Sequence, residues 1–437
     1  MMDRQQLAED VERPVPRVRR PDRSQADPNP GSIDELIPED HPVRLVWELV
    51  EGLDMTGLYA KIRSVEGHAG RPATDPQILV GLWAYATMEG IASARRLAKL
   101  CYRDDAFKWL RGGVDVNYHT LADFRTDYGE WLEQQVVDVV AVLMHEGLID
   151  LNCVGQDGMR VRASAGSGSF KREAKLEERL QEAQHQWEHL QQEFENGATE
   201  PSARERAARQ RAARERVERL ERAKEERKKI EAGREARKKG DGQQARASMT
   251  DPEARRMKMG DGGFRPAYNL QFATTLDTLV IVGVDVINAG SDGGQMEPMV
   301  EQIETQQGAL PGEYYVDGSF SVNDDIDHVA QRGVTVYAPV KDAEKKKREG
   351  KDPYAPQKGD VPQVAAWRQR MGTEEAKVKY RQRSKCEWPN AMCRNRNLQQ
   401  FTVRGLTKVK AAVLWYVLVH NLLRMVVLRA QRASAVE

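Results

Sequence analysis

The chain lacks an excess of charge of either sign, and it contains few cysteines. Its 437 residues include 67 Lys and Arg and 67 Asp and Glu, so the formal net charge is +0. Overall charge therefore does not indicate nucleic-acid binding, and any basic surface has to be local. The four cysteines, Cys101, Cys153, Cys386 and Cys393, are scattered and lack C-x-x-C spacing. We expect reduced thiols in a cytoplasmic protein.

Long apolar runs are also scarce. None occurs near the N-terminus, so we expect no signal peptide. The most apolar segment, Ala411 to Leu428, contains His420, Asn421 and Arg424. A membrane span would expose these polar side chains to lipid at a large cost in free energy. The segment is therefore predicted to be a buried core helix, and no membrane partner is expected.

Changes in composition divide the chain into parts. Residues 1–30 are rich in Pro, Arg and Asp, which predicts a flexible tail. Apolar residues at helical spacing predict an all-helical N-terminal domain over residues 31–147. Strands alternate with helices in residues 148–170 and 240–430, and a charged insert occupies residues 171–239. This order predicts an α/β fold with a mixed sheet that is interrupted by one long insertion.

The insert carries an apolar seam. Its members recur at spacings of four and three residues, as in a coiled coil: Leu176, Leu180, Ala183, Trp187, Leu190 and Phe194. Asn196, Gly197 and Pro201 interrupt this pattern, and a second helix with a weaker seam follows. We therefore predict an antiparallel helical hairpin. Its second arm is dense in Arg and Lys, which indicates either contact with DNA phosphates or a solvated face with dimer contacts.

Three carboxylates lie where an α/β protein places a site. Asp157 follows a buried strand, Asp317 ends a later strand, and Glu387 precedes the final helices. Two divalent ions about 3.5–4 Å apart need shared carboxylate ligands and open positions for water and phosphate oxygens. Position alone does not single out these three residues. Other carboxylates compete with them: Asp285, Asp292, Asp324, Asp325 and Asp327.

The spacing around Glu387 adds a motif. Tyr380, Arg383, Glu387 and Arg394 follow the pattern Y-x2-R-x3-E-x6-K, with Arg at the last position. On a helix, the first three side chains would share one face. The pattern resembles the signature of bacterial insertion-sequence DDE transposases, in the group named for Tyr, Arg, Glu and Lys.

Other segments extend this resemblance over roughly residues 31–430. GQDGMRVR (155–162) looks like the family's first Asp strand, and YVDGSF (315–320) looks like its second. Three further stretches resemble its helical domain and its last helix: GRPATDPQ (70–77), GGVDVNYHTLADFR (112–125) and NLLRM (421–425).

The resemblance implies an RNase H-like catalytic core. It also implies cleavage at terminal inverted repeats and transfer of the freed 3′-hydroxyl into target DNA. Asp157, Asp317 and Glu387 would be the catalytic ligands of two Mg²⁺ ions, for which Mn²⁺ can substitute. Two alternatives stay open: an RNase H-like nuclease that does not integrate DNA, and an inactive transposase-derived protein that only binds DNA.

The resemblance also implies contacts with double-stranded DNA, both transposon ends and target, by a homodimer. Tyr380 and Arg383 would contact the end phosphate, as would Arg394 at the family's lysine position. A guanidinium replaces lysine well if the contact is to a phosphate, and poorly if a compact charge is required. Helices predicted over 92–100 and 120–128 form either a helix-turn-helix that reads the repeats or plain helical packing.

Overall fold

The computed structural model describes residues 17–24, 31–67, 71–195 and 203–436. The chain divides into two compact units, one ending at Gln135 and the other beginning at Val136, and each is described by itself. Most of the tail predicted over residues 1–30 lies outside the described residues. Its residues 17–24 are instead held against the N-terminal unit, since β1 (Val18–Arg19) pairs in parallel with β2 (Ala73–Thr74).

The N-terminal unit is helical, as the spacing of its apolar residues predicts. Its elements are η1 (Ile33–Leu36), α1 (Pro42–Glu51), α2 (Thr56–Tyr59), α3 (Pro76–Met88), α4 (Ala94–Arg103), α5 (Asp105–Arg111) and α6 (Tyr118–Asp127). The Asp75 side chain begins α3 by accepting a hydrogen bond from the Gln77 N–H, and Pro76 occupies the first turn. Trp83 is buried on α3 and donates to the Leu121 carbonyl, which ties α3 to α6. The boundary between the units lies inside α7 (Gly129–His145).

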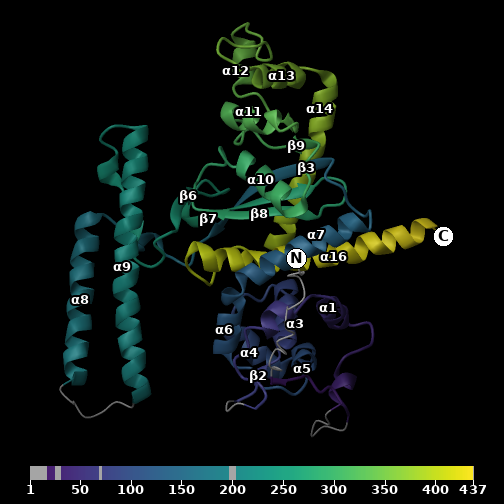
Figure 1. The fold of residues 1–437 in the computed structure, drawn as a ribbon. Coiled ribbons are helices and arrows are strands. Elements are labelled where there is room, and N and C mark those ends of the chain that lie inside the picture. Colours follow the sequence, from purple (N-terminus) through teal and green to yellow (C-terminus); the bar gives the residue numbers. More distant parts are fainter. Residues whose placement is uncertain (1–16, 25–30, 68–70, 196–202, 437) are drawn as a thin grey trace, which may run out of the picture. The chain divides into compact units, whose positions relative to one another are not determined.

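The second unit is built on a mixed sheet, which agrees with the predicted fold class. Its strands are β3 (Cys153–Arg162), β6 (Arg255–Lys258), β7 (Phe264–Thr275), β8 (Ile281–Ile287), β9 (Glu313–Tyr315) and β10 (Thr335–Tyr337). The strand order is β10-β9-β3-β7-β6, and β8 also pairs with β7 (Figure 1). Strands β3, β9 and β10 are parallel, whereas β7 runs antiparallel to β3, β6 and β8. Two short strands, β4 (Phe170–Lys171) and β5 (Ala247–Ser248), pair separately at the start and end of the insert.

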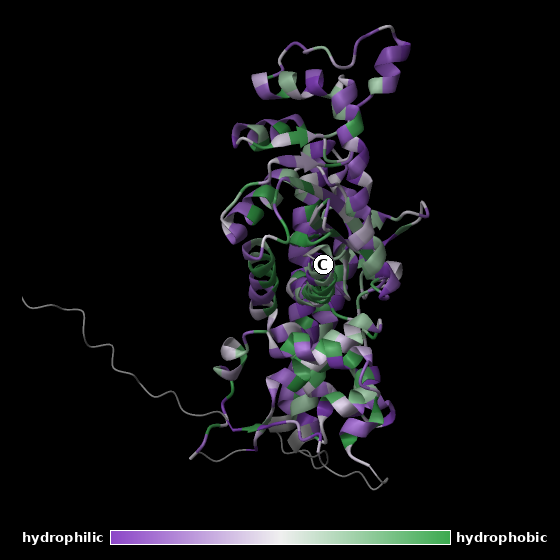
Figure 2. Ribbon diagram, turned by 90° about the vertical axis from the view of Figure 1, so that its right-hand side faces the viewer, coloured by the Kyte–Doolittle hydropathy of each residue, from purple (hydrophilic) through white to green (hydrophobic). Residues whose placement is uncertain are grey.

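Further helices of the second unit lie on this sheet or extend from it. They are α10 (Met296–Gln307), α11 (Asn323–Gln331), α12 (Ala343–Arg348), α13 (Pro362–Met371), α14 (Glu374–Tyr380), α15 (Glu387–Asn395) and α16 (Leu406–Val436), with the 3-10 turn η4 (Arg381–Cys386) between α14 and α15. Both α10 and α16 pack on β8. Among the described residues, α16 is the one helix long and apolar enough to span a membrane, but 78% of its apolar window is buried inside the protein. In Figure 2 it points toward the viewer near the centre, coloured as hydrophobic.

Two hydrogen bonds fix α16 on the sheet. The Asn421 side chain is fully buried, accepts from the Ile281 N–H at 3.0 Å and donates to the Ile281 carbonyl at 2.8 Å. Asn421 therefore continues the hydrogen bonding of β8 into the helix layer. This buried position agrees with the prediction of a core helix.

The insert folds as two helices, α8 (Glu173–Glu195) and α9 (Ala203–Arg237), which lie side by side in Figure 1. Leu176 packs with Ala223 and Leu180 with Leu220, so the two helices run antiparallel. The predicted seam is buried at Leu176, Leu180 and Ala183, but Trp187 and Leu190 are only half-buried. Residues 196–202 and the Phe194 side chain lie outside the described residues. The antiparallel pair agrees with the prediction, and its coiled-coil geometry stays a prediction.

Candidate active site

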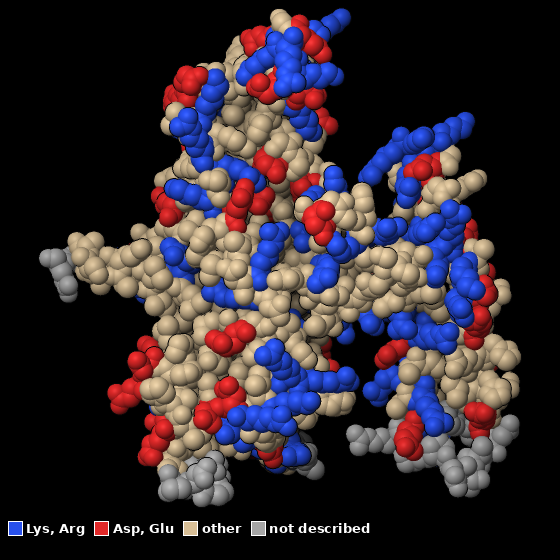
Figure 3. Space-filling view, turned by 180° about the vertical axis from the view of Figure 1, so that it is seen from behind, with Lys and Arg blue, Asp and Glu red and all other residues tan. Residues whose placement is uncertain are grey.

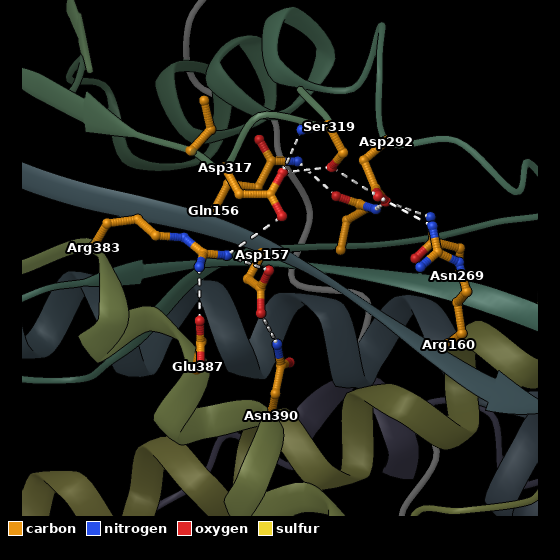
Figure 4. Close-up of polar contacts among 12 residues, drawn as sticks. Gln156, Asp157, Arg160, Asn269, Asp292, Asp317, Ser319, Arg383, Glu387 and Asn390 are labelled. Carbon is orange, nitrogen blue, oxygen red and sulfur yellow. Dashed lines mark hydrogen bonds and ion pairs between the residues drawn. The ribbon is translucent and has the colours of Figure 1, made fainter. Parts of the chain in front are cut away.

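Neighbouring parallel strands bring two of the candidate carboxylates together. The prediction that Asp157 follows a strand is wrong, because Asp157 lies inside β3, where the strand continues to Arg162. Gly155, two residues before it, pairs with Tyr315, the last residue of β9. Asp317 follows Tyr315 by two residues, so both Asp residues lie at the same distance beyond one register pair. Glu387 is the first residue of α15, a helix in the C-terminal part of the chain that contacts strand β7 of the sheet. The structure therefore brings the three predicted residues to one place (Figure 4).

One guanidinium lies among these three carboxylates. Arg383 Nη2 is 2.8 Å from Asp157 Oδ1 and 3.7 Å from Asp317 Oδ2, and Nη1 is 2.7 Å from Glu387 Oε1. The Arg383 side chain is only 15% exposed. A cation held by three carboxylates at these distances neutralises much of their mutual repulsion. The site is thus a set of acidic oxygens that already holds a positive charge.

The three carboxylates differ in their exposure. The Asp157 side chain is 16% exposed and that of Glu387 is 57% exposed. The pKa of Asp157 is raised to about 6, first by burial and also by the negative charges of Asp317 and Glu387, whereas Arg383 and the Asn390 amide oppose this shift. The charge of Asp157 therefore depends on the groups that surround it in the site.

Asn390 belongs to the site, although the sequence motif does not include it. It lies on α15, is 4% exposed, and its Nδ2 donates to Asp157 Oδ2 at 2.7 Å. Its own oxygen Oδ1 is buried and has no hydrogen-bond partner among the residues that the structure describes. Its position three residues after Glu387, on the same side of a helix, was the signal available in the sequence. Asn390 and Arg383 each take one oxygen of Asp157, so together they fix the orientation of its carboxylate.

A second buried carboxylate, Asp292, supports the loop that carries Asp317. Its Oδ1 accepts from Asn269 Nδ2 at 2.6 Å and from Gln271 Nε2 at 2.9 Å. Its Oδ2 lies 3.2 Å from Arg160 Nη2 and 3.1 Å from the Ser319 hydroxyl. The same hydroxyl is 2.5 Å from Asp317 Oδ1. Asp292, which the sequence offered only as a competitor, thus anchors the Asp317 loop to strands β3 and β7.

Close packing leaves no room for a larger residue beside Asp292. A Cβ on Gly158 would lie 2.4 Å from Asp292 Oδ1. The glycine after Asp157 is therefore required for the buried carboxylate to reach the strand.

The predicted DNA contacts are placed in three different ways. Arg383 is bound to the carboxylates, and the Tyr380 hydroxyl donates to the Val316 carbonyl at 3.1 Å, next to Asp317. Arg394 is exposed on α15, and its side chain forms no hydrogen bond or ion pair within the described ranges. Of these three side chains, Arg394 is the one that is exposed to solvent. Tyr380 and Arg383 hold parts of the site together.

The segment from Tyr380 to Glu387 corrects one expectation. A continuous helix was expected to place Tyr380, Arg383 and Glu387 on one face, but α14 ends at Tyr380 and a 3-10 turn leads to α15. Pro389 gives a physical reason, because it has no N–H to donate and is tolerated only in the first turn of a helix. The pair of Arg383 with Glu387 forms nevertheless.

The carboxylate oxygens of the site are suitable ligands for a divalent cation, although the distances between them are set by the Arg383 guanidinium that they surround. Carboxylate oxygens are the ligands that Mg²⁺ prefers, and Asp157, Asp317 and Glu387 supply them from three elements. In the part of the chain that the structure describes, no group of three acidic, His or Cys side chains is close enough to enclose a metal ion. The carboxylates are spread around the larger guanidinium. Arg383 would have to leave for them to approach one ion.

Comparisons with known proteins match two parts of the chain. Residues 31–127 match a family model described as a transposase domain, and residues 235–422 match one described as a transposase DDE domain. Asp317 and Glu387 lie inside the second match, whereas Asp157 and most of the insert lie outside both. No curated protein and no solved structure matched the chain.

Proposed function

Because the chain belongs to the insertion-sequence DDE transposases, a family whose DDE domain implies an RNase H-like fold, we propose that it cuts DNA at terminal inverted repeats and joins the freed 3′-hydroxyl to target DNA. The observation that carries this proposal is the convergence of Asp157, Asp317 and Glu387 on one guanidinium. Transposases act on DNA, and their family generally uses divalent metal ions.

In this proposal Asp157, Asp317 and Glu387 hold two Mg²⁺ ions. When bound, such ions activate the attacking water or 3′-hydroxyl and stabilise the leaving oxygen. Asn390 holds Asp157 in the orientation needed for this, and Asp292 does the same for Asp317 through Ser319. Catalysis then rests mainly on positioning and on neutralising charge at the phosphate.

The N-terminal unit would supply part of the DNA grip. Helix α4 carries Arg95, Arg96, Lys99 and Arg103 and no acidic residue, and none of the four forms an ion pair within the described residues. Arg95 lies over the exposed ring of Tyr118, 5.3 Å from its centroid. Unpaired cations beside an exposed aromatic ring favour contact with a nucleic-acid backbone over plain helical packing.

The two rival functions can be separated from this one. A nuclease would cut end-bearing DNA in Mg²⁺ without forming joined products, and an inactive relative would bind the DNA without cutting it. The purified chain, incubated with end-bearing duplex, a target plasmid and Mg²⁺, is expected to give both cut ends and strand-transfer products. Cut ends without joined products would replace the proposal with the nuclease. The proposal includes a homodimer that holds two transposon ends. The number of protein copies in the complexes with end-bearing duplex would test this part.

The pKa of Asp157 makes a prediction about metal binding. Its pKa is raised to about 6, so the carboxylate is charged above that pH and becomes protonated below it. Because metal ligands have to be deprotonated, Mn²⁺ affinity should fall as the pH is lowered from 7.5 to 5, by roughly tenfold for one proton. Isothermal titration at the two pH values measures this. In Asp157→Asn, whose amide does not titrate, binding should be weak and its dependence on pH much smaller. An equal loss in both proteins would assign the effect to another group.

Arg394 makes a second prediction. If it contacts an end phosphate, Arg394→Ala should flatten the salt dependence of end binding by about one phosphate contact, whereas Arg394→Lys should keep most of the activity. A merely structural Arg394 predicts a lower melting temperature of the Ala variant with an unchanged salt slope. Measuring both quantities on the same variant decides between them.

A further inference from the structure

Three arginines lie along one side of the second hairpin helix. Arg216, Arg219 and Arg222 are spaced three residues apart on α9, which keeps them within one sector of the helix surface. Arg404, in the loop between α15 and α16, lies close enough to Arg219 to repel it. These four residues are called the arginine cluster.

Carboxylates act on the arginine cluster only without direct contact, Glu215 on Arg219 and Asp251 on Arg404. None of its members forms an ion pair with an acidic side chain within the described residues, and their polar partners are neutral oxygens. Arg216 donates to Gln186 Oε1 at 2.7 Å, Arg219 to the Met249 carbonyl at 3.1 Å, and Arg404 to the Ser164 carbonyl at 3.1 Å: each hydrogen bond uses one of five N–H groups.

The contrast with neighbouring residues on α9 is direct. Lys224 pairs with Glu177, and Arg227 pairs with Glu173 and Glu231. The pKa of Arg219 is lowered, first by burial and then by the charge of Arg404, while Glu215 opposes the shift. Lys224 and Arg227 are thus each paired with a carboxylate, whereas the members of the arginine cluster form no ion pair within the described residues.

The arginine cluster lies where the hairpin joins the catalytic core. Met249 and Ser164, the backbone partners of Arg219 and Arg404, belong to the segments on either side of the insert. Arg404 also follows α15, the helix that begins with Glu387 and carries the exposed Arg394. Figure 3 shows Lys and Arg gathered along the hairpin and on the core surface beside it.

We propose that the arginine cluster binds the phosphate backbone of duplex DNA at the base of the hairpin, beside the catalytic core. Guanidinium groups suit this ligand, because each presents a fork of N–H donors that matches two phosphate oxygens. The inference rests on the proposed function. It goes beyond it, since Arg216, Arg219 and Arg222 lie outside both family matches. The base of the hairpin then adds DNA affinity without reading sequence.

The test uses the full chain and a fluorescent duplex of random sequence, with affinity measured over a series of NaCl concentrations. Arg222→Gln should flatten the slope of log affinity against log salt by about 0.9, and the double variant with Arg404→Gln by about twice that. Lys228→Gln is the matched control: Lys228 is exposed on another side of the same helix, and its loss should leave the slope unchanged. Melting temperatures of all variants should stay at the wild-type value.

Three results would overturn the proposal. One is an unchanged slope in the double variant, and another is an equal change in Lys228→Gln, which would reflect general charge only. The third is a change in the mass of the DNA-free protein with an unchanged slope, which would assign the arginine cluster to contact with a second copy. Cleavage by the wild-type chain distinguishes failure of the inference from failure of the proposed function. If the wild type cuts and joins DNA while the slopes are unchanged, only the DNA contact of the arginine cluster is disproved.

Discussion

Asp157→Ala, Asp317→Ala and Glu387→Ala should each lower cleavage of end-bearing DNA by roughly 10³-fold or more. The reason is that ligands of a shared metal site act as a unit, so the loss of one disables the others. DNA affinity should change little, because the DNA grip comes from Arg and Lys elsewhere. Cleavage in Mg²⁺ and affinity in Ca²⁺ would be measured on the same preparations.

The matched control is Asp324→Ala. Asp324 is a carboxylate that competes in the sequence, but it lies exposed on α11 outside the site. Its loss should leave cleavage near the wild-type rate. Substantial cleavage by any of the three site variants would remove that residue from the metal ligands. Equal losses of DNA affinity and cleavage would indicate that the carboxylates support the fold of the DNA-binding surface instead.

The convergence of these carboxylates was predictable because it depends on strand order and register. Asp317 follows the apolar strand β9, and although Asp157 lies inside β3 and not after a strand, the parallel register of β3 with β9 places the two residues at the same level of the sheet. The spacing of Arg383 and Glu387 likewise predicted their contact, which forms even though the helix between Tyr380 and Glu387 is interrupted. Local sequence patterns were sufficient where the two residues in contact are close in the sequence, or where the regular pairing of two strands sets their positions.

Other parts of the site depend on contacts that no local pattern encodes. Asn390 and Asp157 are separated by 233 positions, and Asp292 receives its hydrogen bonds from two strands, β3 and β7, and from the loop that carries Ser319. A buried Asn or Asp has the same appearance in sequence as an exposed one, because burial is decided by tertiary packing. The interrupted helix was different, since Pro389 marks a first helical turn and was a usable signal.

Arg383→Ala should have two opposite effects. In the structure the Arg383 guanidinium pairs with all three carboxylates, so it competes with any other cation for the same oxygens. Its removal should strengthen Mn²⁺ binding to the DNA-free protein by about tenfold, because the metal ion no longer has to displace the positively charged guanidinium from the carboxylates. Cleavage should nevertheless fall by about 100-fold if Arg383 moves to the end phosphate when DNA binds.

The conditions of this experiment follow from the pKa of Asp157. Arg383 lowers that pKa, so its loss raises the pKa above its present value of about 6, and titrations at pH 8 keep the carboxylate charged. Without the guanidinium the three carboxylates repel one another. The variant should therefore melt at a lower temperature than the wild type without metal, and Mn²⁺ should raise its melting temperature by more. Arg383→Lys keeps one positive charge and is expected to bind Mn²⁺ more nearly as the wild type does. Metal affinity that is the same in wild type, Ala and Lys variants would mean that Arg383 does not occupy the metal position in solution. Its role would then be limited to the DNA phosphate.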